Sequence, residues 1–403
     1  MDVPRLQLLL REIDHRYVAP QSPSMSFLRS FHDWIHNTLG PTTSWTTSKL
    51  SILEDTSSAI IERAYPFADT EMRSLMGKLT ALAIVIDDSL DDGLAGEAMY
   101  EEIGNFAHYV YIGKSQTSGL LNLYHGCIKE LSHALEGDAV LRGIAVTPWI
   151  QFVDACLLEK RLLTVDTKLR ASPYDMGYKD TGNNNIKTKL LRTLLTWPLC
   201  LFLCSPEYIR NKTSIAEAYA AAIFKATKKQ DLLLSRYIKA LPDMSFHIAV
   251  INDLFSFHKE ELEGETANMI HLRTQSLKDR RGTGSHGEWT LSDTFNLFCD
   301  EVRDATYRVD EILRLEDCEK IVREGLDSGD MGLSDVDVAI ALQWRGWRDG
   351  YISWHLESQR YKLDFLRPEH PQFSHETKLD FATSGGWVDF MHSAFMKITQ
   401  KTK

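Results

Sequence analysis

Apolar residues recur along most of this 403-residue chain at the three- and four-residue spacing of an α-helix, and strictly alternating stretches are few. This pattern predicts an all-α protein. The helices are expected at residues 4–17, 25–39, 49–65, 70–92, 97–113, 117–135, 147–168, 186–204, 215–241, 245–264, 290–316 and 335–365. Stretches rich in glycine, asparagine or proline are expected to form loops at residues 171–185, 278–288 and 367–374.

The chain contains no glycine-, proline- or serine-rich linker of convincing length. Its length allows two or three domains, but we expect a single domain over residues 1–403. The core of this domain is expected at about residues 45–365, with the first helices and the C-terminal tail at the periphery. The content of 43% hydrophobic and 25% charged residues is that of an ordinary globular protein.

An almost wholly apolar run, residues 81–86, leads directly into the acidic sequence DDSLDD. Asp87 and Asp91 lie one helical turn apart, about 40° from each other on one face, while Asp88 points elsewhere and is the weaker ligand candidate. Like charges at a helix C-terminus repel each other and oppose the helix dipole, and a bound cation would relieve both effects. A solvated acidic helix end is the alternative.

A second polar motif follows the apolar residues 246–251. Asn252, Ser256 and Glu260 are spaced by four residues, so they sweep only about 80° of a helix surface. An amide, a hydroxyl and a carboxylate on one stripe suit a hard cation such as Mg²⁺, which keeps several waters and binds phosphate. Lys259 lies about 20° from Asn252 and can reach the same phosphate. The alternative is the ordinary polar face of an amphipathic helix.

Together these motifs resemble those of class I terpene synthases, which have an aspartate-rich motif followed by N-D-x-x-S-x-x-K-E. Residues 351–361, YISWHLESQRY, resemble the Trp-His…Arg-Tyr segment of trichodiene synthase and its fungal relatives. Residues 208–219, YIRNKTSIAEAY, look like the diphosphate-sensing segment that breaks a central helix in this family. The matches are spread in family order over about residues 60–365, and the second metal motif is the most specific of them.

The resemblance implies the helical bundle of class I terpenoid synthases around a central apolar cavity, with three Mg²⁺ ions as cofactors. It implies a lyase of secondary metabolism that ionises farnesyl diphosphate and cyclises the carbocation to a sesquiterpene hydrocarbon or alcohol. The metal ligands that it assigns are Asp87, Asp91, Asn252, Ser256 and Glu260. The diphosphate contacts that it assigns are Arg210, Lys259, Arg360 and Tyr361. The residues that it implies for catalysis are Asp87, Arg210, Asn252, Ser256 and Glu260.

Two details extend this interpretation. Ser214 stands where many relatives have glycine after the sensing segment, and we expect its hydroxyl to bond to nearby backbone. A carbocation needs a dry apolar pocket, in which an aromatic face contributes roughly 0.5–2 kcal/mol of stabilisation. Phe255 and Trp354 are the best candidates because they neighbour the predicted ligands, with ordinary core packing as the alternative.

Charge and targeting signals limit the other partners. The net charge of −11 argues against nonspecific binding of nucleic acid or of an anionic membrane surface. Residues 194–204 are apolar but too short for a membrane span. There is no secretory signal and no C-x-x-C motif among the six cysteines, so we expect a cytoplasmic monomer or homodimer that binds a prenyl diphosphate.

Several alternatives remain open at this point. Geranyl or geranylgeranyl diphosphate could replace farnesyl diphosphate, because the depth of the pocket sets the chain length. A chain-elongating prenyltransferase is disfavoured, since that class has a second aspartate-rich motif where this chain has Asn252, Ser256 and Glu260. A synthase that only binds diphosphate and a non-enzymatic helical interaction module are the others, and the module predicts no cavity behind the acidic residues. A lid formed by Arg280 and Arg281 in the basic loop is the alternative to an ordinary surface loop.

Overall fold

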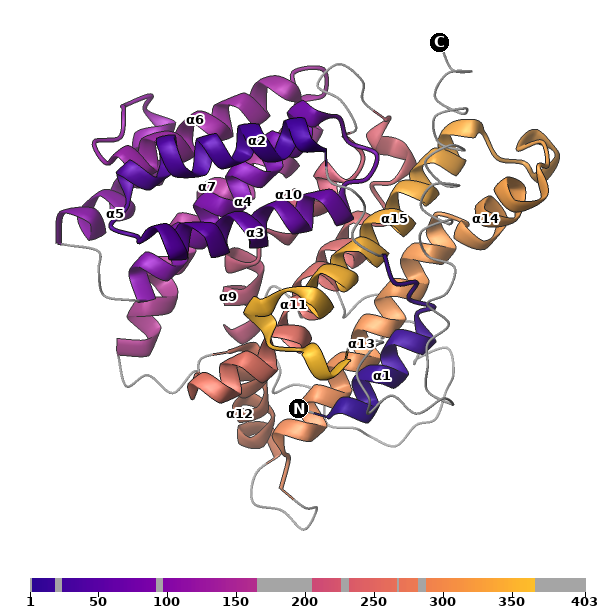
Figure 1. Ribbon diagram of the computed structural model, residues 1–403. Helices are drawn as coiled ribbons and strands as arrows, with labels where there is room; N and C mark the ends of the chain where they lie inside the picture. The colour runs from indigo at the N-terminus through magenta and orange to yellow at the C-terminus, as the bar shows by residue number, and fades with distance from the viewer. Residues whose placement is uncertain are drawn as a thin grey trace.

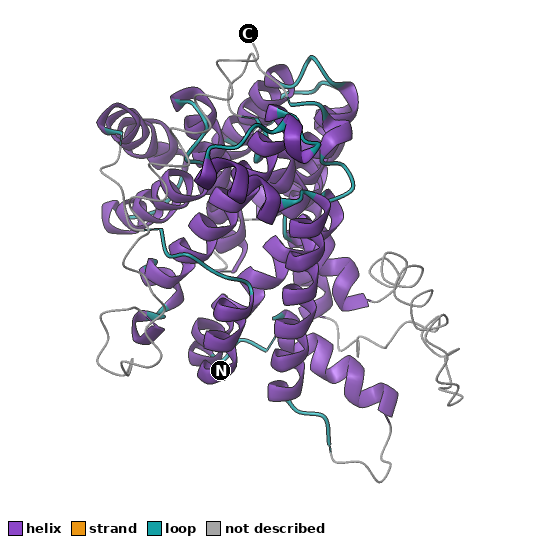
Figure 2. Cartoon of the chain, turned by 90° about the vertical axis from the view of Figure 1, so that its right-hand side faces the viewer, coloured by secondary structure: helices purple, strands orange, loops and turns teal. Residues whose placement is uncertain are grey.

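A computed structural model describes residues 2–18, 24–91, 97–164, 205–225, 232–266, 268–281 and 288–366 (Figures 1 and 2). Every regular element within these ranges is a helix, which confirms the all-α prediction for this part of the chain. The α-helices are α1 (Val3–Glu12), α2 (Met25–Trp34), α3 (Thr47–Ala64), α4 (Thr70–Asp91), α5 (Glu97–Tyr111), α6 (Gly119–Ala134), α7 (Ala139–Thr164), α9 (Ser205–Thr213), α10 (Ala216–Ala222), α11 (Leu241–Glu263), α12 (Met269–Arg281), α13 (Leu291–Ile312), α14 (Leu315–Glu324) and α15 (Asp335–Glu357). The short helices are the π-helical turn η1 (Ile35–Leu39) and the 3₁₀ turns η2 (Gly40–Thr42), η4 (Leu234–Arg236), η5 (Gly329–Met331), η6 (Gln359–Tyr361) and η7 (Asp364–Leu366).

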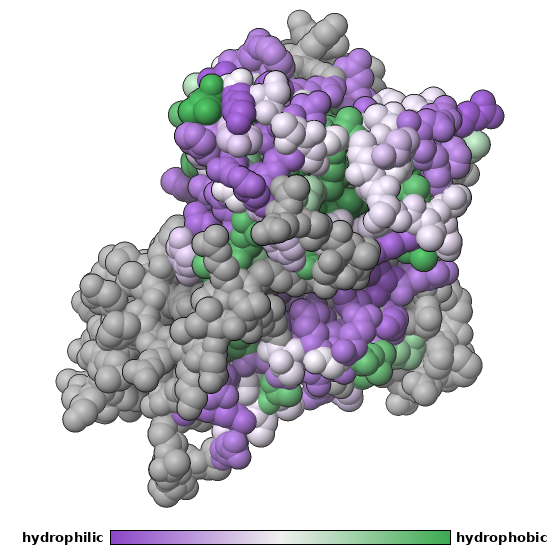
Figure 3. All heavy atoms as spheres, turned by 90° about the vertical axis from the view of Figure 1, so that its left-hand side faces the viewer, coloured by the Kyte–Doolittle hydropathy of each residue, from purple (hydrophilic) through white to green (hydrophobic). Residues whose placement is uncertain are grey.

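The helices pack around α11, which is buried along most of its length. It contacts α10 on one side and α13 on another, and α13 in turn contacts the N-terminal helix α1 (Figure 1). α3 packs against both α4 and α15, so it joins the N-terminal helices to the end of the described chain. One hydrophobic core runs through these elements from Leu6 to Leu366. Among the described residues on the face in Figure 3, hydrophilic ones predominate and hydrophobic ones form small groups.

Several helix boundaries differ from the sequence prediction. The helix predicted at 215–241 is wrong: α10 ends at Ala222, residues 232–240 form turns and η4, and α11 begins at Leu241 with a proline in its first turn. The helix predicted at 290–316 is two helices, because Arg314 takes a left-handed conformation with φ 52° between α13 and α14. The predicted loop 278–288 is wrong for residues 278–281, which continue α12. The segments 171–185, 186–204 and 367–374 lie outside the described residues.

α7 starts eight residues before the predicted helix and continues through Pro148. Among the described residues, its segment 139–158 is the one helix long and apolar enough to cross a membrane. One such helix is weak support for a membrane span, because the core helices of globular proteins have the same composition. Here α7 packs against α4, α5, α6, α9 and α10.

The central part of α15 approaches α3 without an intervening side chain at Gly350. A Cβ atom at this position would lie 2.0 Å from the carbonyl oxygen of Arg63 and 2.9 Å from the backbone nitrogen of Ala64. Both of these atoms belong to backbone, so neither can rotate away. The absence of a side chain at Gly350 therefore sets the distance between two helices that line the cavity described below.

A buried ionic cluster lies on another face of α15, about 100° around the helix from Gly350. Asp349 is 1% exposed, and its carboxylate lies 2.8 Å from Arg345 Nε and 3.4 Å from His15 Nδ1. Burial alone would raise the pKa of Asp349, but Arg345, the hydrogen bond from His15 and Arg348 together lower it to about 2. The backbone N–H of Val18 donates to Ser353 Oγ beside this cluster. Residues 14–18 are thereby attached to α15.

We expect Gly350→Ala to lower the free energy of unfolding by at least about 2 kcal/mol, because a methyl group would push the backbones of α3 and α15 apart. Gly126→Ala in α6 is the matched control, since a Cβ there meets nothing within 4 Å and alanine favours a helix over glycine by roughly 0.5–1 kcal/mol. Urea unfolding of both variants measures the difference. A wild-type midpoint for Gly350→Ala would contradict the close approach.

We expect Asp349→Asn to cost about 2–3 kcal/mol at neutral pH, because it removes a buried anion beside Arg345 and Arg348, whose other partners Glu319 and Asp310 compensate only in part. The folded pKa of about 2 lies below the unfolded value of about 3.9, so the contribution of Asp349 is present above about pH 4 and disappears as the pH falls towards 2. Urea midpoints at pH 7 and pH 3 should therefore show a difference between variant and wild type that narrows in acid. Glu324→Gln, in an exposed pair with Arg323, should leave the midpoint unchanged.

Candidate functional site

The predicted acidic motifs meet at one cavity of about 320 Å³. Asp87 at the end of α4 and Asn252 on α11 are more than 160 positions apart in the sequence, and both line it. Its polar lining is formed by Thr80, Asp87, Asp88, Arg210, Thr213, Ser214, Asn252, Asp253, Ser256, Lys259, Glu260, Glu265, Asn268 and Arg360. Its apolar and aromatic lining is formed by Ile60, Ala83, Ile84, Phe152, Ile209, Ile215, Tyr219, Ile248, Ala249, Met269, Leu272, Tyr351, Trp354 and Tyr361.

The aspartates of the first motif face this cavity from the end of α4. Cys156 Sγ on α7 lies 3.8 Å from an oxygen of Asp87. Asp88, which the sequence suggested points elsewhere, also lines the cavity, and its carboxylate lies 3.5 Å from Arg360 Nη2. That expectation is wrong because the cavity borders a wide part of the circumference of α4 at its C-terminal end, so two consecutive residues both face it. α4 ends at Asp91, whose side chain lies outside the described part of the chain.

The second motif lines the cavity with all four of its predicted members, Asn252, Ser256, Lys259 and Glu260. The four-residue spacing along α11 explains this, since such residues share one face of a helix. Burial raises the pKa of Glu260 to about 7, and a hydrogen bond with Ser256 offsets part of that rise. The carboxylate therefore lies where water does not stabilise its charge and where a cation would.

Asp253 is a site residue that the sequence analysis missed. It is 8% exposed, and burial raises its pKa to about 6 in spite of the nearby guanidinium of Arg210. Arg210 Nε lies 2.9 Å from this carboxylate, and Arg210 Nη2 donates to Asn252 Oδ1 at 2.9 Å and to the Ala249 carbonyl at 3.0 Å. The N-D pair in the motif was a usable signal, because adjacent residues at a wide cavity wall can both face it. Arg210 thus binds both residues of that pair.

The segment that carries Arg210 breaks between α9 and α10, as predicted. Ser214 Oγ accepts a hydrogen bond from the backbone N–H of Ala216 at 3.3 Å, which confirms the expected role of this serine. The left-handed residue of the break is Ile215, with φ 52° and ψ 11°. A β-branched residue rarely adopts this conformation, so the break stores backbone strain beside the cavity.

Arg360 and Tyr361 enter the cavity from η6, directly after α15. The hydroxyl of Tyr361 accepts a hydrogen bond from Asn252 Nδ2 at 3.3 Å. His355, which the sequence analysis did not select, is buried with its Nε2 3.3 Å from the same amide nitrogen. These contacts attach the C-terminal end of α15 and η6 to the second metal motif. The predicted diphosphate residues Arg210, Lys259, Arg360 and Tyr361 all line one cavity, and their roles stay predictions.

The two predicted cavity aromatics have different positions. Trp354 lines the cavity, with its indole N–H donating to the Thr56 carbonyl at 3.1 Å. Phe255 is wrong as a lining residue: it is fully buried behind the site, 5.4 Å from the ring of His355. Its position lies about 100° away from Ser256 around α11, outside the stripe that faces the cavity. Tyr219 lines the cavity instead, with its hydroxyl 2.7 Å from Thr80 Oγ1.

The lining residues fit a hard divalent cation. Carboxylate, amide and hydroxyl oxygens of Asp87, Asn252, Ser256 and Glu260 surround the same space, and these are the ligands that Mg²⁺ prefers. Arg280 and Arg281 end helix α12, and their side chains lie outside the described residues, so a lid at this position stays a prediction. The arrangement can bind a cation and a polyanion at one end and an apolar group at the other.

Comparisons with known proteins identify relatives of the chain. No family model matches it. Terpene synthase BipA of Cochliobolus sativus is 28% identical over 284 residues, which are 70% of this chain and 66% of the relative, slightly less than two thirds of its length. The (E)-beta farnesene synthase of Metarhizium brunneum is 23% identical over 309 residues, 76% of this chain and 72% of the relative.

Solved structures show the same fold. The linalool/nerolidol synthase from Streptomyces clavuligerus, in complex with 2-fluorogeranyl diphosphate, has a TM-score of 0.52. The likeness covers 86% of this chain and 97% of that chain at 16% sequence identity. The class I terpenoid synthase bundle that the resemblance implied is therefore confirmed as the fold.

Proposed function

We propose that this chain, a sequence relative of fungal terpene synthases with the fold of class I terpene synthases, is a Mg²⁺-dependent terpene cyclase. The observation that carries the proposal is the convergence of Asp87 with Asn252, Ser256 and Glu260 on one cavity with an apolar and aromatic lining. A helical interaction module would place these groups in solvent, with no cavity behind them. The cavity therefore disfavours that alternative.

The polar end of the cavity has the groups that an allylic diphosphate needs for ionisation. Mg²⁺ held by Asp87, Asn252, Ser256 and Glu260 would supply Lewis-acid stabilisation of the negative charge on the departing diphosphate. Arg210 and Arg360 can bind phosphate oxygens through two N–H groups each, and Lys259 and Tyr361 can add single donors. In this proposal the positive side chains of Arg210, Arg360 and Lys259 compensate the charge of the diphosphate at fixed positions, which lowers the barrier to ionisation.

The apolar end has the groups that a carbocation needs. Ile60, Phe152 and Ile248 exclude water from the reacting chain and restrict its shape. The rings of Tyr219 and Trp354 can stabilise positive charge without reacting with it, by roughly 0.5–2 kcal/mol each. Intramolecular attack by a double bond of the chain then forms a ring, and loss of a proton or attack by water ends the reaction.

Farnesyl diphosphate is our proposed substrate. A relative named as a farnesene synthase supports it, as does the similarity of residues 351–361 to trichodiene synthase and its relatives. A cavity of about 320 Å³ falls within the range of ligand sites, which typically measure about 300–1,000 Å³. The proposal includes a cytosolic enzyme that works as a monomer or homodimer, and the shorter geranyl diphosphate is its main competitor.

Incubation of the purified full chain with geranyl, farnesyl and geranylgeranyl diphosphate tests the substrate directly. We expect cyclic fifteen-carbon products from farnesyl diphosphate in the presence of Mg²⁺, detected by gas chromatography with mass spectrometry. Chelation by EDTA should abolish product formation, and added Mg²⁺ should restore it. Linear elongated prenyl diphosphates as the sole products would replace the cyclase assignment with the prenyltransferase alternative.

Glu260→Gln tests the metal assignment, because it keeps the size of the side chain and removes its charge. We expect kcat/KM to fall by more than about 100-fold, which is the usual size of the loss of one preorganised electrostatic contact. Glu261→Gln on the same helix is the matched control, since Glu261 pairs with His271 at 3.3 Å and does not line the cavity. Near-normal turnover by Glu260→Gln, with the Mg²⁺ requirement unchanged, would refute the assignment.

A further inference from the structure

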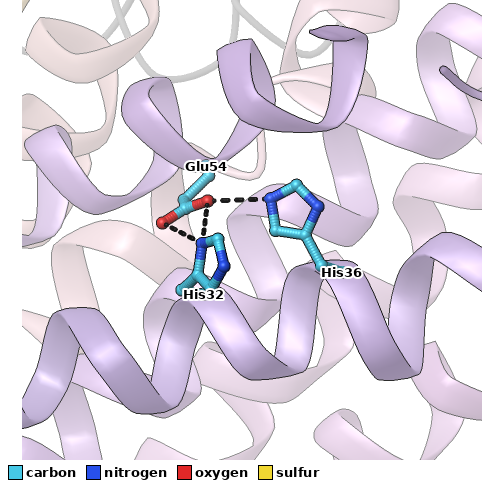
Figure 4. Close-up of side chains that lie close together, drawn as sticks. All are labelled: His32, His36 and Glu54. Carbon is cyan, nitrogen blue, oxygen red and sulfur yellow. Dashed lines mark hydrogen bonds and ion pairs between the residues drawn. The ribbon is translucent and has the colours of Figure 1, made fainter. Parts of the chain in front are cut away.

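Two histidines and a glutamate from the N-terminal part of the sequence meet at a cluster that does not line the cavity (Figure 4). His32 lies in the last turn of α2 and His36 in the π-helical turn η1, so the two imidazoles are four residues apart on one helix face. Glu54 comes from the neighbouring helix α3, and Figure 4 shows its carboxylate directed towards both rings. About 9 Å of helix separates Glu54 from Ile60, the α3 residue that lines the cavity.

The ligand atoms are already close together. Glu54 Oε2 lies 2.9 Å from His32 Nδ1 and 3.0 Å from His36 Nε2, and Glu54 Oε1 lies 3.2 Å from His32 Nδ1. One nitrogen from each histidine and one carboxylate oxygen all lie within 4.8 Å of one another. The side chains of His36 and Glu54 are 16% and 18% exposed, while that of His32 is 56% exposed and leaves a path to solvent.

We propose that His32, His36 and Glu54 bind a divalent transition-metal ion, with Zn²⁺ as the best match. Two imidazole nitrogens and a carboxylate oxygen form a three-ligand zinc set that leaves a fourth position for water. Bonds of about 2.0–2.1 Å to a tetrahedral ion place neighbouring ligand atoms about 3.3 Å apart. The two nitrogen–oxygen separations therefore need to open by only a few tenths of an ångström, and the two nitrogens already lie within 4.8 Å of each other.

The chemistry of the ligands separates this site from the cavity. Mg²⁺ is a hard ion that prefers oxygen, whereas imidazole suits Zn²⁺, Co²⁺, Ni²⁺ and Cu²⁺. The cavity lining offers mainly oxygen atoms as metal ligands. The cluster of His32, His36 and Glu54 offers two imidazole nitrogens and one carboxylate. Excess Mg²⁺ should therefore fill the cavity site without competing for the nitrogen-rich one.

The local backbone favours the arrangement. η1 is a π-helical turn, a rare conformation that occurs frequently at functional sites, and it contains His36. α2 and η1 both pack against α3, so a metal here would cross-link the two sides of the connection between residues 36 and 54. α3 also contacts α4 and α15. Metal binding would thus stabilise the helix layer that supports the cavity, without an ion in the cavity itself.

Titration of the purified full chain with Zn²⁺ in excess Mg²⁺, followed by calorimetry and thermal unfolding, tests the proposal. We expect one micromolar site and a rise in Tm of about 2–4 °C at saturating Zn²⁺. His32→Ala should weaken binding at least about tenfold and remove the rise in Tm, and because this side chain is exposed the variant should fold. Glu54→Gln, which keeps the shape of the side chain, should have the same effect.

Two further variants make the result specific. His133→Ala changes another exposed histidine–glutamate pair, between His133 in the last turn of α6 and Glu136 just after that helix, and should bind Zn²⁺ as the wild type does. Glu260→Gln should also keep the site, which separates it from any Zn²⁺ that enters the cavity and from failure of the proposed function. Absence of a micromolar Zn²⁺ site in the wild type would overturn the proposal. Zn²⁺ binding by His32→Ala and Glu54→Gln as tight as that of the wild type would also overturn it.

Discussion

The structure depends on the placement of carboxylates in a cavity that shields them from much of the surrounding water. Burial raises the pKa of Glu260 to about 7 and that of Asp253 to about 6, which measures how unfavourable their charges are there. Arg210 and Arg360 lie against the acidic residues of the two motifs and offset part of this cost. A fold gains no stability from such an arrangement alone, because buried charge pairs are often no more stable than apolar packing. The arrangement makes physical sense as a binding site for cations and a polyanion.

Keeping these charges together requires helices that do not move relative to one another. The contact at Gly350 sets the distance between α3 and α15, and the contacts of His15 with Asp349 and of Val18 with Ser353 attach residues 15–18 to α15. α15 leads directly into η6, which carries Arg360 and Tyr361 into the cavity. Packing contacts of α15 that take no part in the proposed chemistry therefore determine where Arg360 and Tyr361 lie.

The sequence predicted the parts of the site that follow from helical periodicity. Asn252, Ser256 and Glu260 share a face because their spacing matches the helix repeat, and no tertiary information is needed to see it. The meeting of Asp87 with this stripe was predicted from the ligand chemistry that the two motifs share and from the family resemblance, since periodicity does not say which helices become neighbours. Asp88 and Phe255 were misplaced for the same reason: whether a residue beside a stripe faces the cavity depends on the width of the cavity. The break after α13 was missed because Arg314 adopts a left-handed conformation without a glycine to signal it.

The contacts of Arg210 connect the two halves of the proposed mechanism. Its guanidinium donates to Asn252 Oδ1, the atom that this amide would offer to a metal ion, and also pairs with Asp253. Binding of a cation by Asn252 therefore competes with this hydrogen bond, whereas a diphosphate offers the guanidinium new acceptors. Each of the two ligands would therefore increase the affinity for the other. The cation would release Arg210 from Asn252, and the diphosphate would accept hydrogen bonds from the released guanidinium. Ile215, in its strained left-handed conformation five residues after Arg210, lies where a small change in backbone angles would move that side chain.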